Sequence, residues 1–149
     1  MDQQLAKIEE MSNSFVLVGF QEGSVTKSQV KGNRRKSAGK SMPTIAAENE
    51  FGTKYIPARP FMRTSFDENR GLIQEFIDNE YEKVLGDAST VKRSLNAIGI
   101  FAVGLIQQKI RAIHQPPNSP RTIARKKSSK PLIDFGQMVQ SVRHKVVMP

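Results

Sequence analysis

The sequence predicts an α+β fold in which a small antiparallel sheet packs with two long helices. Apolar residues recur every three or four positions across 73–85 and 95–113, which indicates two long helices. Short apolar or alternating runs at 15–20 and 142–148 indicate strands near the two ends of the chain. A length of 149 residues suits a single domain over residues 1–149.

The first third of the chain predicts a short helix, a strand and a long basic loop. Leu5, Ile8 and Met11 repeat at helical spacing, and the FVLVGF run at 15–20 is apolar and β-branched. Residues 21–42 are polar and glycine-containing, so they cannot bury enough apolar surface to order themselves. We therefore expect a mobile basic loop there.

Turn and capping residues delimit the helices of the middle of the chain. Residues 43–51 predict a short helix, because Pro43 suits a first turn and Gly52 suits a stop. The first long helix is expected to begin at Ser65, which forms a capping-box pattern with Glu68.

Similar signals delimit the second long helix and the segments after it. Gly86 should end the first long helix, and Asp87 or Ser89 should cap the second. The Pro116–Pro117 pair should end that second helix, so residues 116–131 are expected to be a connection. The terminal strand at 142–148 is predicted to pair with the strand at 15–20.

The net charge of +9 is unevenly distributed along the chain. Residues 26–40 and 109–130 contain six and seven basic residues and no acid, whereas residues 48–87 hold nine of the fourteen acids. This balance permits binding to DNA phosphates or to an acidic protein surface, and it also fits solvated loops. The candidate contacts in the first basic segment are Lys31, Arg34, Arg35, Lys36 and Lys40.

The residue types argue against catalysis, a cofactor or a metal site. Cysteine is absent, and neither His114 nor His144 has a metal-binding spacing. No glycine-rich phosphate loop is present. The longest apolar run, at 98–106, is nine residues, whereas a membrane span needs about 20. We expect a non-enzymatic protein without a membrane partner.

The segment at 50–63, EFGTKYIPARPFMR, combines backbone stiffness with little reactive chemistry. Pro57 and Pro60 each fix a φ angle and push the residue before them into an extended conformation. Gly52 permits a tight reversal. The sequence therefore predicts a stiff, extended arm between two helices, with little entropy to lose on docking.

The same segment is rich in the residue types that dominate interfaces, which are aromatic residues and arginine. One interpretation is that the arm contacts another subunit or a neighbouring ring. The alternative is that it holds its own domain together, with Phe61 packed inward and Arg59 paired with Glu48 or Glu50. Both roles are compatible if one face points inward and one outward. The predicted interface residues are Phe51, Tyr55, Ile56, Arg59, Phe61 and Arg63.

Two stretches resemble a known protein family. IAAENEFGT at 45–53 followed by IPARPFMR at 56–63 resembles the signature of phage virion-morphogenesis proteins, also called tail-completion or neck proteins. SPRTIARKKSSKPLIDFGQMVQS at 119–141 is similar to a second element of that family, in the same order and at a matching separation. Phe135 departs from the threonine common there and removes a hydroxyl from the turn. The matched positions are Glu50, Phe51, Gly52, Ile56, Pro57, Arg59, Pro60, Phe61, Arg63, Pro131, Leu132, Asp134, Gly136, Met138 and Ser141.

The resemblance implies a structural protein of a tailed phage or prophage that acts at the head–tail junction. It implies assembly as a homo-oligomeric ring, six-fold or twelve-fold. The implied partners are neighbouring head-connector and tail-terminator or tail-tube proteins, with non-specific contact to packaged DNA. The implied location is the virion neck or tail, after assembly in the host bacterial cytoplasm. The alternative left by the residues alone is a basic protein that binds DNA phosphates without sequence preference.

Overall fold

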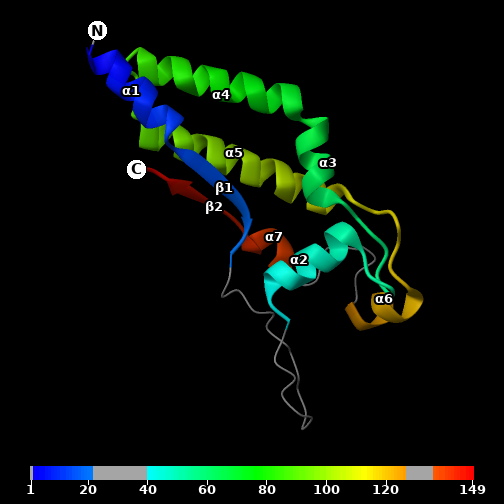
Figure 1. The fold of residues 1–149 in the computed structure, drawn as a ribbon. Coiled ribbons are helices and arrows are strands. Elements are labelled where there is room, and N and C mark those ends of the chain that lie inside the picture. The colour runs from blue at the N-terminus through cyan, green and yellow to red at the C-terminus, as the bar shows by residue number, and fades with distance from the viewer. Residues whose placement is uncertain (1, 22–39, 127–135) are drawn as a thin grey trace. The chain divides into compact units, whose positions relative to one another are not determined.

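The computed structural model describes residues 2–21, 40–126 and 136–149 and has an α+β fold (Figure 1). The expected mobile loop at 21–42 lies almost wholly outside the described residues. Along the chain the elements are α1 (Asp2–Ser12), β1 (Phe15–Phe20), α2 (Met42–Phe51), α3 (Phe61–Glu68), α4 (Arg70–Leu85), α5 (Val91–Ala112), α6 (Pro120–Lys126), α7 (Gln137–Ser141) and β2 (Val142–Val147).

The chain divides into two compact units, each built from separate stretches of sequence. Unit 1 comprises Met1–Gly19, Ser65–Ile106 and Arg143–Pro149. Unit 2 comprises Phe20–Thr64 and Gln107–Val142. Because stretches of the two units alternate along the sequence, α3 and α5 each contribute residues to both units. That the whole chain acts as the single domain predicted over residues 1–149 stays a prediction.

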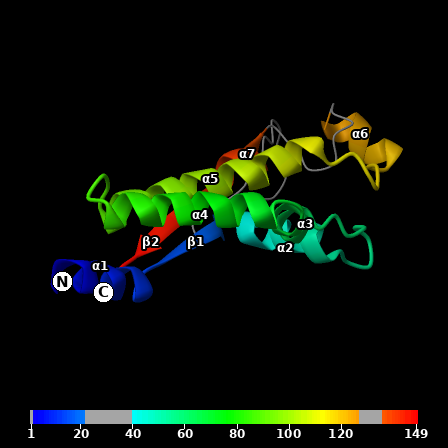
Figure 2. The ribbon, with the colours of Figure 1, turned by 90° about the horizontal axis from the view of Figure 1, so that it is seen from above.

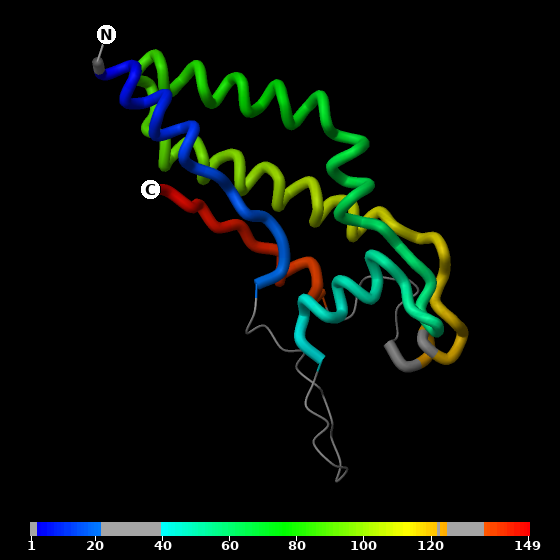
Figure 3. The backbone as a smooth tube through the Cα atoms, in the orientation of Figure 1, coloured from blue at the N-terminus to red at the C-terminus, as the bar shows by residue number. Residues whose placement is uncertain are grey.

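Unit 1 is built on the sheet and the long helices. Strands β1 and β2 pair in an antiparallel sheet, as the sequence predicts, and Figure 3 shows the chain passing from α1 into β1. Phe15 and Leu17 of β1 are exposed, while the alternate residues Val16 and Val18 are half-buried, as expected for a strand with one covered face. Val84, Val91 and Leu95 form one buried cluster of this unit, and Met11, Val16, Ile98, Val146 and Met148 pack against it.

Helices α4 and α5 run antiparallel beside each other and are joined by two kinds of contact (Figures 1 and 2). The rings of Phe76 and Phe101 stack, with centroids 4.3 Å apart. Glu80 is buried, and the side chains of Lys83 and Ser94 hydrogen-bond to its carboxylate. Burial acts to raise the pKa of Glu80, but these hydrogen bonds and the nearby positive charge lower that pKa overall.

The first long helix does not begin where its capping-box pattern predicts. Helix α3 begins at Phe61, four residues before Ser65, and a break after Glu68 separates it from α4. The Glu50 carboxylate accepts hydrogen bonds from the backbone N–H groups of Met62 and Arg63, at 2.9 and 3.1 Å. This distant side chain thus satisfies two of the free N–H donors of the first turn. Ser65 lies within α3 instead of at its start; it is buried, and its hydroxyl has no hydrogen-bond partner among the described residues.

The second long helix is capped by a residue that the sequence reasoning did not choose. The Thr90 hydroxyl accepts a hydrogen bond from the backbone N–H of Arg93 at 3.3 Å, so the expected caps Asp87 and Ser89 are wrong. Residues 116–131, expected to be a plain connection, contain α6. The expected ends of α2 and α4 are confirmed, with glycines 52 and 86 at their C-caps.

Two glycines of α5 stand in different surroundings. A Cβ on Gly99 would overlap the side chain of His144 in β2, so a helix and a strand approach closely there. Gly104, further along the helix and exposed, has no neighbouring atom within 4 Å of such a Cβ.

We predict opposite effects for the two alanine substitutions at these glycines. Gly99→Ala should lower the free energy of unfolding by roughly 1–3 kcal/mol, because a crowded contact must shift. Gly104→Ala should raise that free energy by about 0.5–1 kcal/mol, because alanine is the better helix former. Urea unfolding followed by circular dichroism measures both. Stabilisation by Gly99→Ala would contradict the close approach of α5 to β2.

Candidate functional site

The 50–63 segment folds into a tight loop within unit 2, not the extended arm that the sequence predicts. Gly52 ends α2 with φ +77°, in the region that favours glycine. The Thr53 hydroxyl oxygen accepts hydrogen bonds from the backbone N–H groups of Tyr55 and Ile56. The Thr53 N–H in turn donates to the Ile56 carbonyl at 2.7 Å. The hydroxyl and the glycine together close the turn.

The second half of the segment returns to the end of α2. The Arg59 backbone N–H donates to the Asn49 carbonyl at 2.6 Å. This return brings Ala58 so near Gly52 that a Cβ on the glycine would lie 2.9 Å from the Ala58 nitrogen. The prolines therefore stiffen a closed loop, and glycine is required at position 52 for both space and conformation.

The Arg59 guanidinium is buried and is surrounded by neutral oxygens. The residue is only 3% exposed. Nε donates to the Pro116 carbonyl at 2.8 Å, and Nη2 donates to the Pro117 carbonyl and to Asn118 Oδ1 at 3.2 and 3.3 Å. Nη1 reaches Asn49 Oδ1 at 3.4 Å. One planar side chain thus joins the loop to the chain that follows α5.

The predicted ion pair between Arg59 and an acid is wrong. Glu48 instead lies 2.5 Å from the ammonium of Lys40, and Glu50 caps α3. Burial lowers the pKa of Arg59, yet a guanidinium stays charged at neutral pH. Carbonyl dipoles therefore hold this charge in place of a carboxylate.

Phe61 is also an inward residue. It is 0% exposed, and its ring packs edge-on against Phe20 with the centroids 5.9 Å apart. The prediction that Arg59 and Phe61 are outward interface anchors is therefore wrong. Both side chains are buried and help to hold unit 2 together. The alternative interpretation, that these two residues support their own domain, describes them correctly.

The remaining predicted interface residues face outward to different degrees. Tyr55 is 86% exposed and Phe51 is 73% exposed. Arg63 is exposed, and its Nε lies 4.0 Å from Glu50 Oε1. Ile56 is half-buried. The segment thus has one face that builds the unit and another that displays aromatic rings to solvent.

An apolar pocket of about 440 Å³ lies in unit 2 beside this outward face. The exposed Phe51 ring forms part of its wall, and Glu50 and Arg63 supply its charged groups. Sequence reasoning missed the pocket because its walls come from three separate stretches of the chain; the pair of small residues in α2 was the only local signal. The lining residues are Phe20, Pro43, Ala46, Ala47, Glu50, Phe51, Met62 and Arg63.

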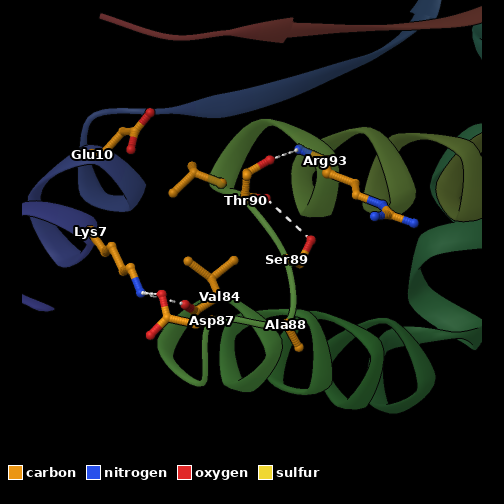
Figure 4. Close-up of a pocket in the computed structure, with 9 residues that line it drawn as sticks. Lys7, Glu10, Val84, Asp87, Ala88, Ser89, Thr90 and Arg93 are labelled. Atoms are coloured by element: carbon orange, nitrogen blue, oxygen red, sulfur yellow. Dashed lines mark hydrogen bonds and ion pairs between the residues drawn. The ribbon is translucent and has the colours of Figure 1, made fainter.

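A second pocket, of about 360 Å³, lies in unit 1 at the start of α5 (Figure 4). Figure 4 shows Lys7 pointing to Asp87, and their atoms Nζ and Oδ1 lie 2.5 Å apart. Lys7 also donates to the Val84 carbonyl at 3.2 Å. Of the four charged residues that line this pocket, Lys7 and Asp87 thus pair with each other and tie α1 to the end of α4.

The basic candidates are mostly beyond the part of the chain that the structure describes. Lys31, Arg34, Arg35 and Lys36 lie outside the described residues. Lys40 is exposed, and its ammonium forms the ion pair with Glu48.

The second family-like element, 119–141, is described at both ends, as α6 and as the residues from 136 onward, but not between 127 and 135. Pro131, Leu132 and Asp134 lie outside the described residues, as does the departure at position 135. Gly136, with φ +71°, precedes α7, and Met138 is buried. These surroundings indicate structural roles at the start of α7.

Charge is partitioned sharply between the two units. Unit 2 contains sixteen Lys and Arg residues against four Asp and Glu, whereas unit 1 contains seven against ten. The excess positive charge of the chain therefore belongs wholly to unit 2, and unit 1 is weakly acidic.

Within the described ranges, no group of three or more His, Cys, Asp or Glu side chains is placed to hold a metal ion. Over the same part of the chain, no helix is long and apolar enough to cross a membrane. In the comparisons with known proteins, no family model, curated protein or solved structure matches this chain.

We predict that Arg59→Lys lowers the free energy of unfolding by about 2–3 kcal/mol. A lysine ammonium cannot reach the carbonyls at 116 and 117 and the Asn49 side chain together, so buried acceptors lose their donors. The matched control is Arg63→Lys, which should change that free energy by less than about 0.5 kcal/mol because Arg63 is exposed. Chemical denaturation measures both, and an equal, small effect of the two changes would contradict the assigned role of Arg59.

Proposed function

We propose that this chain is a structural protein of a tailed phage or prophage that acts at the head–tail junction. Copies assemble into a ring that joins or completes head and tail, without catalysis. The neighbouring head-connector and tail-terminator or tail-tube proteins are its partners. The protein resides in the neck or tail of the virion and assembles in the cytoplasm of the host bacterium.

The two sequence elements that resemble tail-completion proteins are the first support for this proposal. They frame the chain at 45–63 and 119–141, in the order and at the separation expected. Resemblance confined to one short motif would be weak, whereas two separated elements agreeing in order is more specific.

The build of the 50–63 segment is the observation that carries the proposal. Its polar groups are engaged in shaping the loop, with Glu50 capping α3 and Arg59 binding carbonyl oxygens. Its exposed large hydrophobic side chains are both aromatic, Phe51 and Tyr55. A loop held in shape before binding loses little entropy when it docks, and exposed aromatic rings are typical anchors of protein interfaces. This arrangement favours assembly over chemistry.

The charge of unit 2 favours a second, compatible role in contacting DNA. A ring at the head–tail junction surrounds the path of the packaged DNA, and repeated basic segments would neutralise its phosphates without reading sequence. Lys31, Arg34, Arg35 and Lys36 are the candidates for this contact. A purely nucleic-acid-binding protein is the alternative function, and it would show salt-dependent DNA retention without any part in joining.

The proposal is tested in the phage or prophage that encodes the chain. Particles made without the chain should accumulate as separate heads and tails in negative-stain images. Supplying Phe51→Ser together with Tyr55→Ser should fail to restore joined particles, because the exposed anchors are gone. Leu5→Ser is the matched control, since Leu5 is an exposed leucine of α1, and this variant should restore joining. Intact virions formed without the chain would contradict the proposed function.

A further inference from the structure

We infer that copies of the chain associate head to tail, with α4 of one copy docking into the apolar pocket of unit 2 of the next. In this contact Leu72 enters the pocket and Glu75 pairs with Arg63 at its rim. The inference rests on the proposed ring and names the surfaces that form it. It is carried by the apolar pocket of unit 2, an exposed acidic face of α4 and the opposite charges of the two units.

The pocket is built to receive an apolar side chain beside a negative charge. Its walls are mostly apolar, and the Glu50 carboxylate accepts two backbone N–H groups at the start of α3, whose positive end offsets part of its negative charge. The Arg63 guanidinium is exposed at the rim, with only a long 4.0 Å approach to Glu50. Its fork of donors is therefore available to a carboxylate.

The outer face of α4 offers this combination. Leu72 is 50% exposed, and Glu75 follows it three positions later, so the two side chains lie on adjacent parts of one helix face. Asp78 and Glu82 continue the row at the same helical spacing. No described residue forms an ion pair with Glu75 or Glu82, and like charges at this spacing destabilise a helix. A basic partner would remove that repulsion.

Charge also favours this face over two other exposed apolar surfaces. Tyr55 belongs to the basic unit, and the Lys54 ammonium lies 5.7 Å from its ring centroid, so it would bring positive charge to a positive surface. Phe15 and Leu17 share their sheet face with Arg143 and Lys145. Like charges across an interface oppose association, whereas α4 presents carboxylates to a unit with a large excess of Lys and Arg.

The geometry of such a contact fits a ring. The two docking surfaces are different, so each copy can give one and receive one, and a contact of this heterologous kind closes into a ring when its rotation permits. A helix that lays an apolar residue into a groove is a common recognition mode. A closed two-fold dimer would instead need the same contact twice, with each copy both inserting its α4 and receiving the α4 of the other.

Substitutions that reverse the charge at either side of the contact test the inference. Arg63→Glu and Glu75→Lys should each weaken self-association of the purified full chain by about tenfold or more, measured by sedimentation velocity. The double variant, and an equal mixture of the two single variants, should recover association. In the mixture each pocket meets an α4 of opposite charge on the other variant, so copies alternate. Loss without recovery in the double variant and the mixture would overturn the inference.

A second pair of variants tests the same contact without changing Arg63, in case Arg63→Glu disturbs the fold near Glu50. Leu72→Asp should weaken association by about tenfold or more, because a charged group would enter an apolar pocket. Leu5→Asp changes a leucine that is 60% exposed on α1 of the same unit and should leave association unchanged. Circular dichroism checks that all variants keep their helix content. Equal association of the two leucine variants would overturn the inference.

The remaining outcomes separate this inference from the proposed function. If the swaps leave self-association unchanged while removal of the chain still yields separate heads and tails, the α4 contact is wrong and the function stands. If Arg63→Glu abolishes binding of a short DNA duplex but not self-association, the pocket rim serves DNA and the inference is overturned. A wild-type chain that stays monomeric at all concentrations would also overturn it.

Discussion

Unit 2 depends on the placement of one buried cation. The Arg59 guanidinium gathers the Asn49 side chain at the end of α2 and the carbonyls of the two prolines that follow α5. Its acceptors are neutral oxygens, so hydrogen bonds of suitable direction and length hold the guanidinium in place. No opposite charge has to be buried with it. Removing it would leave several acceptors without donors at once. The closed shape of the 50–63 loop follows from this set of bonds and from the turn at Gly52.

The residues of this closed loop have two different roles. Phe61 is buried in unit 2, and Glu50 caps α3. Phe51 and Tyr55 are exposed to solvent. The segment therefore needs no reactive group to be distinctive. Its composition reflects the demands of holding a precise shape and of presenting aromatic surface, which is what an assembly contact requires. In the contact that we propose between copies, the acidic face of α4 and the basic unit 2 would play complementary parts.

The sequence predicted those elements whose signals are local. The two strands and the two long helices followed from periodicity, because a period of two or of about 3.6 reports directly on one buried face. The expected pairing of the two strands is also confirmed. Prediction from the sequence failed where distant groups overrode local patterns. Glu50 moved the start of α3 away from the Ser65 capping box, and Arg59 chose carbonyls after α5 in place of an acid. The pocket was likewise invisible, since its walls meet only in the folded chain.

The central claim is that internal hydrogen bonds hold the 50–63 loop rigid while its outer face is free to bind. Hydrogen–deuterium exchange of the full chain tests this claim most directly, by comparing monomeric and assembled samples. The amides of Thr53, Arg59 and Met62 all donate hydrogen bonds, so they should exchange slowly even in the monomer. Assembly should add protection around the unit 2 pocket and along α4. Exchange of the loop amides in the monomer at the rate of an unstructured peptide would contradict the account.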